Sequence, residues 1–102
     1  MTTQERFVLK LFVTGHTPRS ERAIQNLRRI CEKELEGHYE MVVIDILEQP
    51  EAAEEEKILA TPTLIKALPL PLRRIIGDLT DQEKVLLGLD LLPSPMNPER
   101  IS

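Results

Sequence analysis

L-A-T-P-T-L-I-K-A-L-P-L-P-L-R-R-I-I-G-D-L, residues 59–79, decides how the second half of this chain folds. Pro62 stands directly before strand-type residues, where its missing N–H and fixed φ suit the entrance to a strand. Pro69 and Pro71 interrupt the apolar pattern that follows, so the chain is predicted to reverse there and to return over residues 72–76. This stretch therefore predicts a β-hairpin.

The first half of the chain shows the pattern of a strand, a helix and a second strand. Residues 7–13 are apolar on nearly both faces, which is typical of a strand inside a sheet. Thr17 is a suitable helix N-cap, Pro18 a suitable first helical residue, and Gly37 a suitable end. Apolar residues recur between them at helical spacing: Ile24, Leu27, Cys31 and Leu35. With a second strand at 39–46, this half predicts a right-handed parallel crossover.

The part of the chain after residue 47 is less determined by its local pattern. Pro50 can begin a short helix over 51–57, whose glutamates we interpret as a solvated face and not as a metal site. Thr80 and Glu83 have the spacing of a capping box at the start of a last helix. Residues 85–92 then fit either a helix or a strand, and Pro69 could also end a helix instead of making a turn.

Composition limits the function classes. The 102 residues suffice for one domain, and a formal net charge of -4 argues against general affinity for nucleic acid. No early apolar segment is long enough for a signal peptide or a membrane span, which predicts a cytoplasmic protein. Cys31 is the single cysteine, so neither an intramolecular disulfide nor a Cys-x-x-Cys redox centre can form.

The search for chemistry returns a set of cations and no catalytic group. His16 and His38 lack the serine or cysteine context of a triad, and Gly15 alone cannot form a phosphate-binding loop. Arginines beside apolar residues are plausible anchors for a protein partner, because a guanidinium combines bidentate hydrogen bonding with a partly apolar stem. The candidate partner-binding residues are Lys10, Arg22, Lys57, Arg73 and Arg74. We predict no cofactor and no metal.

Several long runs of this sequence resemble the KaiB family of circadian clock proteins. They are K-L-F-V-T-G-H-T-P (10–18), V-I-D-I-L (43–47), A-E-E-E-K-I-L-A-T-P-T-L (53–64), R-R-I-I-G-D-L-T (73–80) and E-K-V-L-L-G-L-D-L-L (83–92). The resemblance covers nearly the whole chain and divides it into a KaiB-like domain at 1–92 and a Pro-rich tail at 93–102.

The resemblance implies an α/β fold that is thioredoxin-like, with element order βαβαββα and a cis peptide bond at Pro62. The positions where thioredoxins carry their cysteines are occupied here by residues 14–20, which contain none. The family also implies a second, resting fold, βαββααβ, in a tetramer or dimer, whereas the thioredoxin-like form binds its partner as a monomer. Pro62, Gly88 and Asp90 match the positions tied to the switch, and Gly88→Ala and Asp90→Arg are expected to favour the helical arrangement.

The resemblance further implies a non-enzymatic regulator that binds the N-terminal ATPase ring of a KaiC-type protein and modulates its phosphorylation cycle. Its implied partners include KaiA or a KaiB-like sensor kinase, and Lys10, Arg22 and Arg74 match contact positions. Three departures matter: clock members have a basic residue where this chain has Val42, a tyrosine where it has Pro93, and an acidic tail where it has P-S-P-M-N-P (93–98). They leave open an adaptor in stress adaptation. A thioredoxin-like redox protein would have to rely on Cys31 alone.

Overall fold

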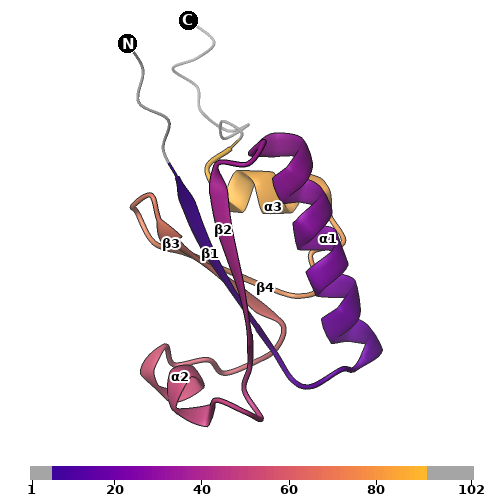
Figure 1. Ribbon diagram of the computed structural model, residues 1–102, viewed down its shortest axis with the longest axis vertical. Helices are drawn as coiled ribbons and strands as arrows, with labels where there is room; N and C mark the ends of the chain where they lie inside the picture. The colour runs from indigo at the N-terminus through magenta and orange to yellow at the C-terminus, as the bar shows by residue number, and fades with distance from the viewer. Residues whose placement is uncertain (1–5, 92–102) are drawn as a thin grey trace, which may run out of the picture.

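A four-stranded sheet forms the centre of the computed structural model, which describes residues 6–91 (Figure 1). Its strands are β1 (Phe7–Val13), β2 (Tyr39–Asp45), β3 (Thr63–Leu68) and β4 (Arg73–Ile76), in the spatial order β2-β1-β3-β4. β1 is parallel to β2 and antiparallel to β3, and β3 is antiparallel to β4. The predicted central strand, crossover and hairpin are therefore confirmed.

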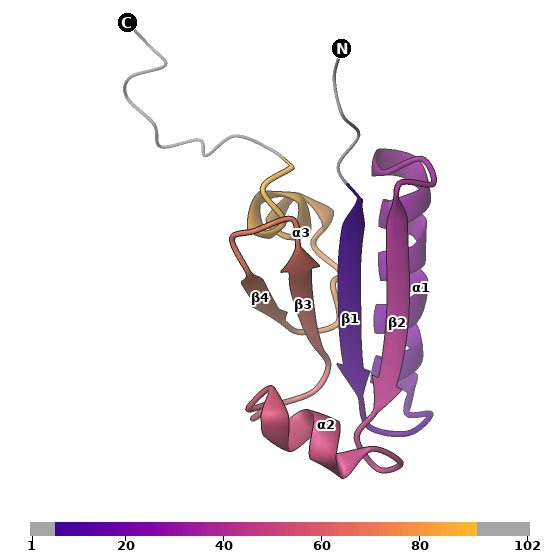
Figure 2. The same ribbon diagram turned by 60° about the vertical axis from the view of Figure 1, so that its left-hand side comes forward.

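Three helices complete the domain: α1 (Pro18–Glu34), α2 (Pro50–Glu55) and α3 (Gln82–Gly88). α1 and α3 cover one face of the sheet, while α2 lies at the end where β1 and β2 finish (Figures 1 and 2). The element order is βαβαββα, as the family resemblance implied. Within residues 6–91 no helix is long and apolar enough to cross a membrane.

The core is aliphatic and divided by the sheet. The larger cluster lies between the sheet and the pair α1 and α3, and its fully buried members include Leu9, Leu11, Leu27, Leu64 and Val85. The smaller cluster lies on the other face, where Phe12, Ile44 and Ile65 are joined by Ala52 of α2. Both clusters meet at β1, because its alternate side chains point to opposite faces.

The start of α1 follows the predicted capping. The Thr17 hydroxyl accepts a hydrogen bond of 3.1 Å from the Ser20 amide, and Pro18 occupies the first turn. The helix ends at Glu34, and Gly37 follows with a φ of 86°, a conformation that glycine adopts without strain. The sequence thus located both ends of the crossover helix within a few residues.

The hairpin is confirmed, and the alternative of a helix ending at Pro69 is wrong for this structure. The pairing of Leu64 with Ile75 and of Ile65 with Arg74 fixes its register. The peptide bond before Pro62 is cis, as the resemblance implied, and so are the bonds before Pro69 and Pro71. Of the two arrangements left open for residues 85–92, the structure has a helix as far as Gly88, after which residues 89–91 form a turn. Leu92 and the predicted Pro-rich tail at 93–102 lie outside the described residues.

The predicted capping box at Thr80 is wrong. The N-cap of α3 is Asp81, whose carboxylate accepts a hydrogen bond of 3.2 Å from the Lys84 amide. Thr80 instead donates its hydroxyl to Asp78 over 2.6 Å, and its amide bonds to the same carboxylate. Because Asp78 already holds both groups of Thr80, the threonine is not free to cap, and the helix begins one residue later.

Candidate partner-binding surface

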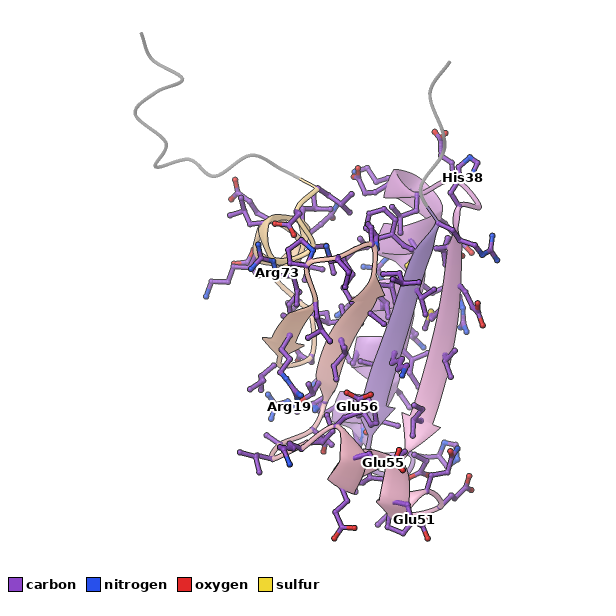
Figure 3. The ribbon with its side chains drawn as sticks, turned by 90° about the vertical axis from the view of Figure 1, so that its left-hand side faces the viewer. Arg19, His38, Glu51, Glu55, Glu56 and Arg73 are labelled. Carbon is purple, nitrogen blue, oxygen red and sulfur yellow. The ribbon has the colours of Figure 1, made fainter. Side chains whose placement is uncertain are left out.

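Three of the five predicted cations gather at the C-terminal end of α2. Lys10 reaches from β1 to the Glu56 carboxylate, with its Nζ 3.4 Å from Oε2. Arg74 reaches from β4 and donates a hydrogen bond to the backbone carbonyl of the same Glu56. Lys57 is the next residue and is exposed, with a φ of 57°. Figure 3 shows Glu56 at this end of the sheet, between α2 and the strands.

These cations lie beside apolar groups that water reaches. An open hollow of about 340 Å³ is lined by Lys57, Leu59, Thr63, Arg74 and Ile76, and we call it the basic hollow. Leu59 is 96% exposed and Ile76 is 67% exposed. A second hollow of about 620 Å³ adjoins it along α2, and Lys57 and Leu59 line both. Exposed apolar groups ringed by cations are typical of a protein-docking surface.

Arg22 lies on a different face, because it belongs to α1. Its Nε donates to Asp78 Oδ2 over 3.1 Å, and the neighbouring Asn26 donates to the Asp78 carbonyl over 2.9 Å. The hydrogen bond from the Thr80 hydroxyl, followed by that from Arg22, lowers the pKa of Asp78 below its usual range. Arg22 therefore ties α1 to the turn before α3 and is not part of the basic hollow.

Arg73 is also held elsewhere, at the opposite end of the sheet from Glu56 (Figure 3). Its Nε lies 3.0 Å from Asp90 Oδ2, and the same oxygen lies 3.1 Å from Nζ of Lys66. Hydrogen bonds from Arg73 and then from Lys66 lower the pKa of Asp90. Lys66 is buried, and its ammonium lies 6.0 Å from the centre of the Phe7 ring. Asp90 thus joins the end of α3 to both strands of the hairpin.

The two other residues assigned to a fold switch lie on either side of that hairpin. Pro62 is buried at the entrance of β3, and its carbonyl accepts a hydrogen bond of 2.9 Å from the Gly77 amide. Gly88 is in the last turn of α3, where a Cβ would come within 2.7 Å of Cδ1 and 2.9 Å of Cγ1 of Ile75. Each of the three candidate switch residues, Pro62, Gly88 and Asp90, therefore lies against the hairpin or the turn that follows it.

The place of a thioredoxin's redox centre holds hydroxyl groups. Thr14 and Thr61 are hydrogen-bonded through their side chains over 2.6 Å, and the Thr17 and Ser20 hydroxyls follow at the start of α1. Cys31 is fully buried in the middle of α1, and burial raises the pKa of its thiol to about 12. A thiol in that state supplies no nucleophile at neutral pH. Within residues 6–91, no three His, Cys, Asp or Glu side chains gather as a metal site would require.

Sequence reasoning missed the residues that organise the surface. Glu56 was interpreted as one of a solvated acidic run, although it holds both Lys10 and Arg74. Leu59 was noted in the sequence, but no pattern indicated that it would remain exposed. No sequence pattern indicated that Asp78 would pair with Arg22. The pairing partners lie far apart in sequence, which is why composition and spacing could not find them.

The fold is that of the thioredoxin-like class. The N-terminal domain of Synechococcus elongatus SasA superposes with a TM-score of 0.71 and 26% identity, over 92% of each chain. Mitochondrial thioredoxin 3 of Saccharomyces cerevisiae superposes with a TM-score of 0.68 and 20% identity, over 87% of this chain and 81% of its own. At that identity the thioredoxin likeness shows the fold alone.

Sequence comparison identifies the family. The model of the KaiB domain matches residues 10–91. The circadian clock oscillator protein KaiB of Synechococcus elongatus is 60% identical over 92 residues, 90% of each chain. The circadian clock protein KaiB3 of a Synechocystis strain is 59% identical over 88 residues, 86% of each chain. This chain belongs to the KaiB family.

Proposed function

We propose that this protein is a non-enzymatic clock or timing regulator that binds the N-terminal ATPase ring of a KaiC-type protein. The observation that carries the proposal is the basic hollow: Lys57 and Arg74 beside exposed Leu59 and Ile76, in a chain whose net charge is -4. Family membership supports it, since relatives about 60% identical are named circadian clock oscillator proteins.

The hollow is suited to an acidic and partly apolar protein surface. Arg74 donates one hydrogen bond to the Glu56 carbonyl, and this bond fixes its guanidinium at the edge of the hollow. A guanidinium that is already oriented loses less conformational freedom when a carboxylate binds it. Leu59 and Ile76 supply the apolar contact that cations alone cannot. Lys10, paired with Glu56, is available to a partner at the cost of a part-exposed ion pair.

The test measures binding to KaiC homologues from the same genome, by pull-down and by a surface-based binding assay in which one partner is immobilised. Arg74→Glu and Lys57→Glu should each weaken binding at least about tenfold, because a like charge replaces an attractive one at a contact. Arg28→Glu, an equally exposed reversal on α1, is the matched control and should bind as the wild type does. Binding of all three variants within error of the wild type would remove the hollow from the interface.

We also propose that the thioredoxin-like arrangement is the binding state and that the chain has a second, resting arrangement of its C-terminal half. The supporting observation is that α3 is short, seven residues, and that the ion pairs between its end and the hairpin all meet at one side chain, Asp90. A short element held by one polar centre can change its partners at smaller cost than a long one. Size measurements that find one thioredoxin-like species at all concentrations, without and with KaiC, would contradict this second state.

The identities of the two named relatives to this chain are too similar to choose between a role in a circadian oscillator and a role in stress adaptation. KaiB of Synechococcus elongatus and KaiB3 of Synechocystis are 60% and 59% identical to this chain. The role in a circadian oscillator and the alternative role in stress adaptation therefore both use the same proposed KaiC-binding surface. Loss of rhythm in a deletion strain would support the first role, and an unchanged rhythm with impaired stress survival the second.

A further inference from the structure

Glu56 lies at the junction of three elements. It is the C-cap of α2, its Oε2 lies 3.4 Å from Nζ of Lys10 on β1, and its carbonyl accepts a hydrogen bond from Arg74 on β4. The side chains of Lys10 and Glu56 are 34% and 30% exposed, so water reaches the ion pair. Figure 3 shows Glu56 nearer to the strands than Glu55, the residue before it.

The position of the Glu56 carboxylate is not explained by the helix that carries it. The C-terminal end of an α-helix has a partial negative charge, which favours a cation there and disfavours an anion. The last turn of α2 contains no basic residue that could offset this charge. Lys10 is therefore the group that holds the Glu56 side chain in place.

The same contact limits what Lys10 can offer to a partner. An ammonium carries a single positive charge, and the Glu56 carboxylate already pairs with it. An acidic side chain of a partner would have to displace that carboxylate or lie beside it, and like charges placed together repel. The basic hollow differs in this respect, because its described lining, Lys57, Leu59, Thr63, Arg74 and Ile76, contains no acidic residue.

We propose that the Glu56 carboxylate occupies, in the free protein, the place on Lys10 that an acidic side chain of the partner takes in the complex. Glu56 is then a specificity-determining residue, because a partner regains the lost ion pair only if it brings a carboxylate to this point. Arg74 keeps its orientation during the exchange, since it is bonded to the Glu56 carbonyl and not to the carboxylate. The inference rests on the proposed binding of a KaiC-type protein and names the residue that restrains it.

The first test compares two neutral replacements near the end of α2 in binding to KaiC homologues from the same genome. Glu56→Gln removes the charge and keeps the carbonyl that holds Arg74. It should lower the dissociation constant about threefold, a modest gain because water screens a part-exposed pair.

Glu55→Gln is the matched control for this replacement. It removes the same charge one residue earlier, from an exposed side chain that takes part in none of the ion pairs within residues 6–91. Its dissociation constant should equal that of the wild type. Equal gains in the two variants, or no gain in Glu56→Gln, would overturn the proposal.

The second test separates an action through Lys10 from a general repulsion of the partner. Lys10→Met removes the ammonium and should weaken binding, because no cation would then meet the partner carboxylate. In that background Glu56→Gln should change the dissociation constant no more than Glu55→Gln does, since the carboxylate has no ammonium to occupy. A threefold gain that persists without Lys10 would assign the effect to repulsion and contradict the exchange.

The outcomes distinguish this inference from the proposed function. A wild type that binds KaiC, together with a Glu56→Gln variant that binds no more tightly, would contradict the restraint alone. A wild type that does not bind KaiC would contradict both. Urea unfolding checks for a merely structural role: a Glu56→Gln variant with a lower midpoint and an unchanged affinity would show that Glu56 only supports α2.

Discussion

Nζ of Lys66 lies 3.1 Å from Oδ2 of Asp90, although the lysine side chain is only 2% exposed and the aspartate side chain is 42% exposed. A buried ammonium requires a nearby anion, because its desolvation is otherwise uncompensated. Asp90 supplies that anion from just beyond α3, where its own φ is 63°. The end of the last helix is therefore fixed by a charge on β3.

The first prediction is that Asp90→Asn destabilises the thioredoxin-like arrangement, because Lys66 would remain buried beside a neutral amide. Asp90→Arg should destabilise it more. Helix-end electrostatics alone favours a cation there, but that cation would face Lys66 and Arg73. Urea unfolding followed by circular dichroism measures both effects.

Lys66→Met is the matched variant for this prediction. It removes the buried charge and leaves Asp90 paired with Arg73, so it should unfold at the wild-type urea concentration or above. If Asp90→Asn were as stable as the wild type while Lys66→Met were not, the ion pair would not be the contact that holds α3.

The second prediction concerns Gly88. Replacement of a helical glycine by alanine normally gains about 1 kcal/mol. Here the new Cβ would lie 2.7 Å from Cδ1 of Ile75, so Gly88→Ala should fail to stabilise the protein. Ile75→Ala removes both Cδ1 and Cγ1, the carbons that the new Cβ would approach too closely, and the double variant should recover about 1 kcal/mol relative to the sum of the two single changes. A double-mutant cycle with no coupling would show that Ile75 moves aside freely.

The third prediction separates the two groups of arginines. Arg22→Glu breaks the bond to Asp78 and places two anions together, so it should lower the urea midpoint as well as any binding to KaiC. Arg74→Glu should weaken binding to KaiC and leave the midpoint nearly unchanged, because exposed substitutions usually cost under about 0.5 kcal/mol. Equal loss of stability in both variants would remove this distinction.

The fourth prediction is a dependence on acid. The bonds from Thr80 and Arg22 lower the pKa of Asp78 in the folded protein. Its stabilising contribution is therefore fully present above the ordinary aspartate pKa of about 3.9 and is lost as the pH falls through the lowered value. Asp78→Asn should flatten the fall in stability that sets in as the pH drops below about 5. Glu54→Gln, exposed on α2, serves as the control, and an equal flattening there would contradict the assignment to Asp78.

The fifth prediction concerns Cys31. Because the thiol is buried and its pKa is raised to about 12, the folded protein should not react with thiol reagents and should reduce no disulfide substrate. Cys31→Ser should keep KaiC binding, at a cost of about 1–3 kcal/mol in stability for the buried hydroxyl. Turnover of a disulfide substrate that disappears in the variant would reverse this conclusion.

Periodicity predicted those elements whose burial is decided locally. The apolar run of β1 and the capped, amphipathic α1 could be read from the sequence because each carries its own signal. The N-cap of α3 could not, since Thr80 and Asp81 are both good caps and only the contact of Thr80 with Asp78 decides between them. The burial of Lys66 depends on its ion pair with Asp90, which lies 24 residues further along the chain.

The site shows the same division between local and distant causes. Three of the five cations meet near Glu56 because the sheet order brings β1 and β4 toward the end of α2. Arg22 and Arg73 each have an aspartate partner that chain spacing does not indicate. Sequence could therefore name the candidate residues, but it could not sort them into one surface and two structural ties.

Because β1 lies between β2 and β3, its alternate amides face two different strands. The amides of Phe7 and the odd-numbered residues after it face β2, whereas those of Lys10 and Phe12 face β3. Any rearrangement of the C-terminal half must open the second set and can leave the first closed. Neighbouring amides of β1 would then exchange their hydrogens with solvent at different rates. The ratio of those rates would measure how often β3 separates from β1 while β2 stays paired with it.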